Sequence, residues 1–249
     1  MMTRGECKTL AKEQLKGGWG QAAILTLIYA LLIFAVGLLD FIPILGWVIG
    51  ILVYPMLLLG YMLYFILNSR REPVEIGTMF SVFRNFKVYW GRTFCALLLI
   101  ALWILLYSLL GIVLMVLGFL NMDAIQEGYY ASAGSVMSAS LMLTSGYVLA
   151  LIGTLLVWLK YGFSFFLLLD FPELRATEAL KRSAQLTRGH KGEFFVLYLS
   201  FIGWAFLALL TCGIGGLWLQ PYIMQTVINF YQSLQYRRVE PEQAGPEVY

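Results

Sequence analysis

The sequence predicts an all-α protein, a polytopic bundle of about six transmembrane helices with amphipathic helices at the membrane interface. The first observation behind this prediction is composition: 60% of the 249 residues are hydrophobic and only 12% are charged, whereas soluble domains carry about 25% charged residues. The second is that apolar residues cluster in runs of about 20, the length that a helix needs to cross a bilayer. Because too little polar surface remains to cover a water-soluble core, lipid is the expected solvent.

Six apolar segments reach or approach that length, and they are residues 21–39, 45–67, 93–120, 141–169, 194–212 and 214–234. The third and fourth exceed the minimum, so we expect these helices to tilt or to protrude from the bilayer. The sixth is interrupted by Gln220 and Pro221, and a half-span or an interfacial helix is the alternative for it. Proline is tolerated in a span where neighbouring groups satisfy the freed carbonyl.

The basic residues predict the orientation. Every one of the 17 Lys and Arg residues except Lys160 lies in one of four segments, 1–20, 70–92, 175–191 and 237–238. The connections 40–44, 121–140 and 213–215 contain none. Because cytoplasmic loops carry the excess of Lys and Arg, this alternation predicts an even number of spans, both termini in the cytoplasm, and a multi-pass protein of the cytoplasmic membrane.

The N-terminal segment predicts a basic amphipathic helix, because basic residues recur every four positions beside an apolar face that includes Cys7, Ala11 and Leu15. Such a helix lies on anionic headgroups, where each basic residue contributes about 1 kcal/mol. Residues 173–188 predict a similar helix, for which a solvated connector is the alternative. Anionic membrane lipids are therefore the expected partners. The candidate headgroup contacts are Arg4, Lys8, Lys12, Lys16, Lys181, Arg182, Arg188 and Lys191.

The domain organisation expected from this pattern is a single transmembrane domain over residues 1–236, followed by a flexible cytoplasmic tail over residues 237–249. The stretch Gln14-Leu-Lys-Gly-Gly-Trp19 is echoed by Gln185-Leu-Thr-Arg-Gly-His190. Repeated hairpins are common in membrane bundles. The echo suggests three helical-hairpin repeats, at about 1–68, 76–170 and 173–235, although apolar sequences also produce such likenesses by chance.

The sequence carries no signature of catalysis or of a metal site. None of the phosphate-binding, zinc-protease or serine-hydrolase motifs is present. The one histidine, His190, stands at a predicted helix exit, and the three cysteines, Cys7, Cys95 and Cys212, are far apart in the chain. We therefore expect a protein that is not an enzyme and that has no cofactor. The net charge of +3 is too small to indicate nucleic-acid binding.

Lys160 is the one basic residue inside an apolar run. A charge near the bilayer centre costs at least about 2.5–3.5 kcal/mol, so it is expected to face a partner or a wet cavity. Asp170 and Gln220 are the candidate polar partners, which makes these three residues a candidate intramembrane site. The alternative is that Lys160 snorkels to the interface beside Trp158 and Tyr161.

Small residues predict close helix contacts at two places. Gly46 and Gly50 form one pair, and Gly146, Ala150 and Thr154 form a ridge. Both patterns allow backbones to approach closely. Packing within the chain is the simpler interpretation, and a homo-oligomer or a protein partner is the alternative.

The C-terminal third carries a family resemblance. Its signature includes Leu199-Ser-Phe-Ile-Gly-Trp204, Leu217-Trp218, Pro221-Tyr222 and Phe230-Tyr231, and near the N-terminus stands Leu15-Lys-Gly-Gly-Trp-Gly20. Together these resemble the bacterial membrane-protein family catalogued as domain of unknown function 975, with one departure at Thr187-Arg-Gly-His190. A weaker likeness points to the membrane domain of some glycerophosphodiester phosphodiesterases, whose catalytic barrel has no counterpart here.

The resemblance implies a bacterial cytoplasmic-membrane protein and assigns it no activity. The leading hypothesis is a non-enzymatic protein acting in membrane lipid organisation or envelope homeostasis, which the basic helices favour. The alternative is a transporter or permease for a small or lipid-like substrate, which Lys160 and the interrupted sixth segment favour.

Overall fold

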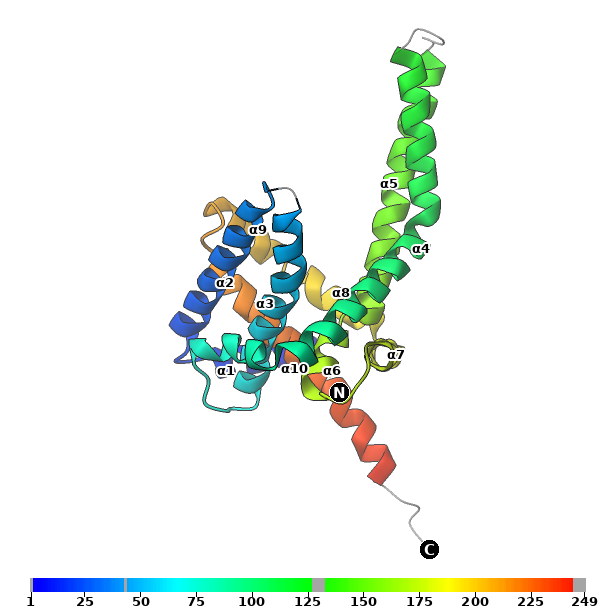
Figure 1. Cartoon of the computed structure of the whole chain (residues 1–249). Coiled ribbons are helices and arrows are strands. Elements are labelled where there is room, and N and C mark those ends of the chain that lie inside the picture. Colours follow the sequence, from blue (N-terminus) through cyan, green and yellow to red (C-terminus); the bar gives the residue numbers. More distant parts are fainter. Residues whose placement is uncertain (1, 43, 127–132, 244–249) are drawn as a thin grey trace, which may run out of the picture. The chain divides into compact units, whose positions relative to one another are not determined.

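The computed structural model describes residues 2–42, 44–126 and 133–243, so parts of the predicted connections 40–44 and 121–140 and of the predicted tail lie outside the described residues. Within the described ranges every regular element is helical, as the composition predicts (Figure 1). The elements are α1 (Arg4–Leu15), α2 (Trp19–Leu39), α3 (Leu45–Ser69), the 3₁₀ helix η1 (Ile76–Asn85), α4 (Phe86–Gln126), α5 (Ala133–Tyr161), α6 (Ser164–Asp170), α7 (Ala176–Leu186), α8 (Lys191–Leu199), α9 (Ile202–Leu210) and α10 (Gly216–Gln243).

Five helical segments in the described part of the chain are long and apolar enough to cross a membrane, which makes this a multi-pass membrane protein. They correspond to the first five predicted spans. The segments are Trp19–Leu39, Leu45–Ser69, Ile76–Met122, Gly134–Asp170 and Lys191–Leu210.

The sixth predicted span is helical but is not among these five. It forms the first part of α10, which continues without a break through Pro221. Polar side chains such as Gln225 and Asn229 lie along it, and both are buried against protein rather than offered to lipid. The burial of these polar side chains shows that this part of α10 packs against the protein. Its backbone is helical up to Gln243, within the segment expected to be a flexible tail.

The chain forms two compact units. Unit 1 comprises residues 1–96 and 163–249, and unit 2 comprises residues 97–162. A true threefold repeat stays a prediction.

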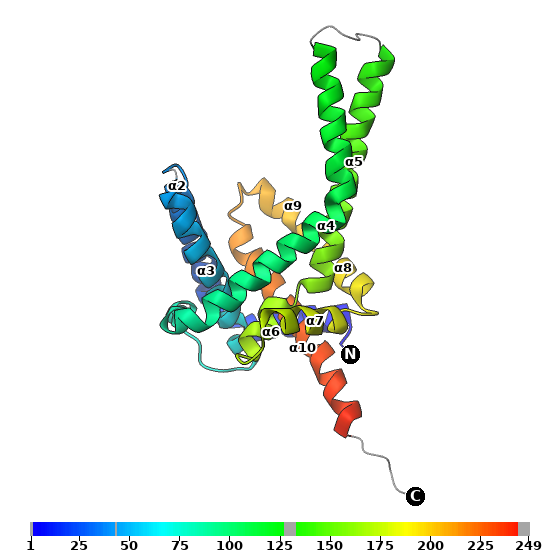
Figure 2. The same ribbon diagram turned by 45° about the vertical axis from the view of Figure 1, so that its right-hand side comes forward.

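In unit 1, α2 and α3 run side by side in opposite directions (Figure 2). The rings of Tyr29 and Tyr61 stack with centroids 4.6 Å apart, and the hydroxyls of Thr26 and Tyr61 lie within 3.0 Å. A Cβ on Gly46 would lie 2.0 Å from the carbonyl oxygen of Leu39. The expectation that this glycine serves close packing within the chain is confirmed.

Helix α1 packs on the other helices of unit 1 through its apolar face. Cys7, Ala11 and Leu15 are almost completely buried, and the Asn229 side-chain amide of α10 donates to the Cys7 carbonyl at 3.3 Å. The small side chains of Cys7 and Ala11 allow this approach. The apolar face that the sequence predicts is therefore covered by protein rather than by lipid, and the basic residues remain on the other faces.

A second packed region of unit 1 is an aromatic cluster. The ring of Phe163 lies 4.7 Å from that of Phe194 and 5.5 Å from that of Tyr231 between centroids, and Phe194 stacks on Phe230 at 5.8 Å. These residues come from α8, α10 and the start of α6, so the cluster joins three helices far apart in sequence. The backbone N–H of Phe163 also donates to the Ser183 hydroxyl of α7.

Unit 2 consists of the long antiparallel pair formed by α4 and α5 (Figure 1). A Cβ on Gly111 would lie 2.5 Å from the carbonyl oxygen of Gly146 and 2.7 Å from the amide nitrogen of Ala150. The Ser108 hydroxyl donates to the Ala150 carbonyl at 3.2 Å. The predicted ridge at Gly146 and Ala150 thus serves packing within the chain.

Candidate functional site

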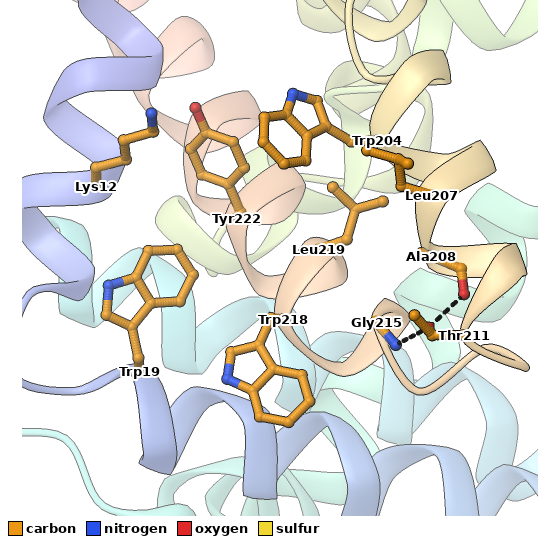
Figure 3. Close-up of a pocket in the computed structure, with 10 residues that line it drawn as sticks. All are labelled: Lys12, Trp19, Trp204, Leu207, Ala208, Thr211, Gly215, Trp218, Leu219 and Tyr222. Atoms are coloured by element: carbon orange, nitrogen blue, oxygen red, sulfur yellow. Dashed lines mark hydrogen bonds between the residues drawn. The ribbon is translucent and has the colours of Figure 1, made fainter.

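Unit 1 contains an apolar cavity of about 380 Å³ between helices α1, α2, α9 and α10. Figure 3 shows Lys12 and Trp19 at one end and Thr211 and Gly215 at the other. The walls between the two ends are aromatic and aliphatic. The lining residues are Lys12, Trp19, Trp204, Leu207, Ala208, Thr211, Gly215, Trp218, Leu219 and Tyr222.

The far end of the cavity is shaped by the turn between α9 and α10. Cys212 and Gly213 both have positive φ, 55° and 86°, which reverses the chain within a few residues. The Thr211 hydroxyl accepts from the Gly215 amide at 2.8 Å and donates to the Ala208 carbonyl at 2.7 Å. The one hydroxyl at this end is therefore already engaged, and the turn brings the two helices into one hairpin.

The other end of the cavity is basic and aromatic. The Lys12 ammonium lies 5.7 Å from the centroid of the Tyr222 ring, and the Lys8 ammonium lies 4.3 Å from that of Phe201. Lys8 also donates to the Ser200 carbonyl at 3.4 Å. Cations over aromatic faces gain about 0.5–1 kcal/mol at exposed sites. These contacts hold the two lysines on the α1 side of the cavity.

The lysines of α1 also affect one another. Partial burial, followed by the charges of Lys12 and Arg4, lowers the pKa of Lys8 from its ordinary value of 10.5. An anion beside these side chains would offset both the desolvation and the mutual repulsion, because it favours the charged form of each. The basic end of the cavity is thus suited to a negatively charged group.

The cavity is lined mainly by apolar side chains. Among the described residues that line it there is no carboxylate, thiol or imidazole, and no group of three metal-ligating side chains occurs in the described part of the chain. Apolar walls with one cation at an end fit the binding of an amphiphile rather than the activation of a nucleophile.

A partly buried hydrogen-bond network joins α1, α3 and α10. Gln225 accepts from the Asn68 amide at 2.9 Å and donates to the Gln14 side chain at 3.0 Å. Gln14 in turn donates to the Ser69 carbonyl at 3.2 Å, and Gln232 donates to the Ser69 hydroxyl at 2.7 Å. Because each amide has a partner, the network fixes the three helices in one register.

Asp170, a predicted member of the intramembrane site, pairs instead with residues of unit 1. Its carboxylate accepts from Arg70 at 2.7 Å and from the Tyr231 hydroxyl at 2.9 Å. The side chain is 5% exposed. This contact ties the end of α6 to the end of α3 and to α10, which gives Asp170 a structural explanation.

Lys160 belongs to unit 2, where its ammonium lies over aromatic rings. The distances to the ring centroids are 4.7 Å for Trp103, 4.9 Å for Tyr161 and 5.9 Å for Tyr107. Gln220 is an exposed side chain of α10 in unit 1. A joint site of Lys160, Asp170 and Gln220 stays a prediction, and the ring contacts fit the snorkelling alternative, which names Tyr161.

The predicted headgroup contacts differ in exposure. Lys8 and Lys191 are half-buried. The Arg182 guanidinium lies 5.4 Å from the centroid of the Phe171 ring. The exposed members are Arg4, Lys12, Lys16, Lys181, Arg182 and Arg188.

Sequence reasoning missed the aromatic walls of the cavity and the amide network. Trp204 and Trp218 stand in the signature that carries the family resemblance, yet their separation in the chain gives no sign that they line one space. A signal for the network was present: Gln225, Asn229 and Gln232 follow one another at spacings of four and three, which places them on one face of α10. A polar face on an apolar helix indicates contact with other polar groups.

The comparison with protein families identifies the chain. The model of the family described as protein of unknown function (DUF975) matches residues 1–238, so the chain belongs to that family, as the signature predicts. The weaker likeness to glycerophosphodiester phosphodiesterases has no support from this match. No curated protein and no solved structure matches the chain.

Proposed function

We propose that this member of the DUF975 family acts in membrane lipid organisation without catalysing a reaction, and that its basic helices α1 and α7 bind anionic lipid headgroups. The observation that carries the proposal is the arrangement of α1. Its apolar face is buried by the protein, so Arg4, Lys12 and Lys16 are directed outward. A folded surface that presents cations in fixed positions selects anionic lipids more strongly than a mobile segment does, because less freedom is lost on binding.

The proposal includes a cytoplasmic position for both termini. The network around Gln225 links α1 and α10 to the end of α3, where Arg70 and Arg71 follow. The basic residues of the N-terminal helix thus lie at the same end of α3 as these arginines. This clustering supports the orientation expected from the positive-inside rule, with the basic end in the cytoplasm.

The test is the lipid composition around the protein. The protein is reconstituted into vesicles of phosphatidylcholine and phosphatidylglycerol in equal parts, released in polymer nanodiscs, and its lipids are quantified. We expect phosphatidylglycerol to be enriched over the bulk vesicle. The double substitution Arg4→Gln and Lys16→Gln should lower the enrichment, whereas Glu13→Gln, which removes an exposed negative charge from the same helix, should not. A wild-type ratio equal to that of the bulk vesicle would contradict the proposal.

The second candidate function is a permease for a lipid-like substrate. The observation that favours it is the cavity, since an apolar space with one cation also fits a transported amphiphile. Under this alternative, vesicles that contain the protein would move a fluorescent anionic lipid between leaflets faster than protein-free vesicles. Lys160→Met would slow that movement if Lys160 lies on the path. Equal rates in vesicles with and without protein would exclude this function.

A further inference from the structure

We propose that the cavity between α1, α9 and α10 holds part of one acyl chain of an anionic phospholipid, with the headgroup beside Lys12. This inference rests on the proposed function and specifies the lipid class and the place where a single lipid binds. It is carried by three properties of the cavity: its apolar walls, its length and its charged end.

The walls match an acyl chain because they are apolar and partly exposed. Helix α9 has no buried residue and lies in a segment apolar enough to cross the membrane. Trp204 of α9 is 57% exposed and Trp218 of α10 is 47% exposed. In a bilayer these exposed side chains would face the hydrocarbon region, so an acyl chain would be able to enter the cavity sideways.

The size of the cavity fits part of a chain rather than a whole lipid. Its volume, about 380 Å³, is near the lower end of the range for small-molecule sites, about 300–1,000 Å³. Gly215 and Tyr222 mark its length along α10, and that stretch of helix rises about 10 Å. One leaflet of the hydrocarbon core is about 15 Å thick. The cavity therefore covers most of the depth that one acyl chain occupies, and the end of the acyl chain remains in the bilayer.

The charged end determines the headgroup class. Lys12 lines the cavity and lies over the Tyr222 ring, while Lys8 and Arg4 stand on the same helix. A phosphate beside Lys12 would reduce the repulsion that these cations exert on one another. Trp19, 6.2 Å from Tyr222 between ring centroids, provides the amphipathic ring that membrane proteins place at headgroup level. The acyl chain would thus extend from the headgroup level toward the turn at Thr211.

The experiment is native mass spectrometry of the full-length protein released from vesicles of phosphatidylcholine and phosphatidylglycerol in equal parts. The wild type is expected to retain one phosphatidylglycerol after bulk lipid has been removed. Ala208→Phe fills the cavity and should reduce the occupancy of this adduct at least about tenfold, because a ring cannot share the space with a chain. Ala205→Phe is the matched control, since Ala205 is on the same helix, exposed and outside the lining.

A second pair of variants tests the headgroup. Lys12→Gln should leave one bound lipid but remove the preference for phosphatidylglycerol over phosphatidylcholine. Lys16→Gln, an exposed lysine of the same helix that does not line the cavity, should keep that preference. Protection of the buried Cys7 thiol from alkylation serves as the folding control for every variant.

The outcomes separate this inference from the proposed function. An adduct that persists unchanged in Ala208→Phe would overturn the cavity site, even if phosphatidylglycerol remained enriched in the surrounding lipid. If the wild-type adduct contains the two lipids equally and is lost in Ala208→Phe, the acyl-chain site is supported and the headgroup assignment is overturned. Loss of the adduct in Ala208→Phe with unchanged enrichment of phosphatidylglycerol in nanodiscs would support both the site and the proposed function.

Discussion

Helix α3 of unit 1 and the long helices of unit 2 are both apolar, but the protein buries them to different extents. In α3 of unit 1, 61% of the most apolar window is buried within the protein, whereas in the segment that contains α4 the figure is 11%. Unit 1 combines an aromatic cluster with the amide network around Gln225. Unit 2 relies on backbone contact at small residues such as Gly111 and Gly146.

The difference shows that hydropathy alone does not report how a membrane helix is stabilised. Lipid is as apolar as leucine, so an apolar surface gains little by moving from lipid to protein. Unit 2 adds the Ser108–Ala150 hydrogen bond and the contacts of Lys160 with aromatic rings, and its long helices are little buried by the protein. Unit 1 adds hydrogen bonds between helices and therefore holds its helices in fixed positions, which a binding site requires.

The largest effect is expected from adding a methyl group at one of the closest glycine contacts described in unit 1. A Cβ on Gly60 would lie 2.0 Å from the Met79 carbonyl oxygen, so Gly60→Ala forces α3 and η1 apart. We expect a loss of about 3 kcal/mol of unfolding free energy, measured by denaturation in mild detergent. Gly77→Ala, where the added methyl meets nothing within 4 Å, is the control and should change stability by less than about 1 kcal/mol. Equal losses in the two variants would refute this account of the contact.

A smaller effect, confined to unit 2, is expected from Gly111→Ala. The new methyl would meet the Gly146 carbonyl oxygen at 2.5 Å and separate α4 from α5, at a cost of about 2 kcal/mol. Hydrogen exchange followed by mass spectrometry should become faster in residues 97–122 and 134–162. Alkylation of Cys7 in unit 1 should stay slow. Gly91→Ala, an open position in the same helix, should behave as wild type. If Cys7 became reactive in Gly111→Ala, the two units would not be independent in stability.

The smallest effect concerns the thiol of Cys7. Burial, followed by the neighbouring charge of Glu6, raises its pKa from 9.0 to about 11. The folded state therefore favours the neutral thiol, so the contribution of Cys7 to stability is complete below about pH 9 and is lost as the pH rises toward 11. In a Cys95→Ser background at about pH 8, maleimide should label Cys212, which is exposed in the turn after α9, and leave Cys7 unlabelled until the protein unfolds. Rapid labelling of both thiols would mean that α1 is not packed on α10.

The amphipathic character of α1 and the first five spans could be predicted from the sequence, because both depend on residue spacing and on runs of apolar residues. What covers the apolar face of α1 could not. Spacing shows that Cys7, Ala11 and Leu15 share a face, and that face would suit lipid or protein equally well. Protein covers this face because Asn229 and its neighbours on α10, more than 200 residues away in the chain, pack against α1.

The candidate site also combines features that the sequence predicts with features that it does not. The basic residue at one end of the cavity was predicted, since Lys12 belongs to a visible stripe. The apolar walls were not, because Trp204 and Trp218 approach each other only after the turn at Cys212 and Gly213 reverses the chain. The pairing of Arg70 with Asp170 was not predicted, since the sequence made Asp170 a candidate partner of Lys160.

The sequence by itself determined that this protein is a multi-pass helical membrane protein of the DUF975 family, where its first five spans lie, and which of its helices are basic. These properties follow from local composition and periodicity, which act through the solvent that each segment prefers. Only the tertiary structure decided that α10 packs against α1 and α3 through buried amides, and that α1, α2, α9 and α10 enclose a cavity. Those features depend on contacts between residues distant in the chain, and apolar sequence carries little information about them because many helix pairings bury it equally well.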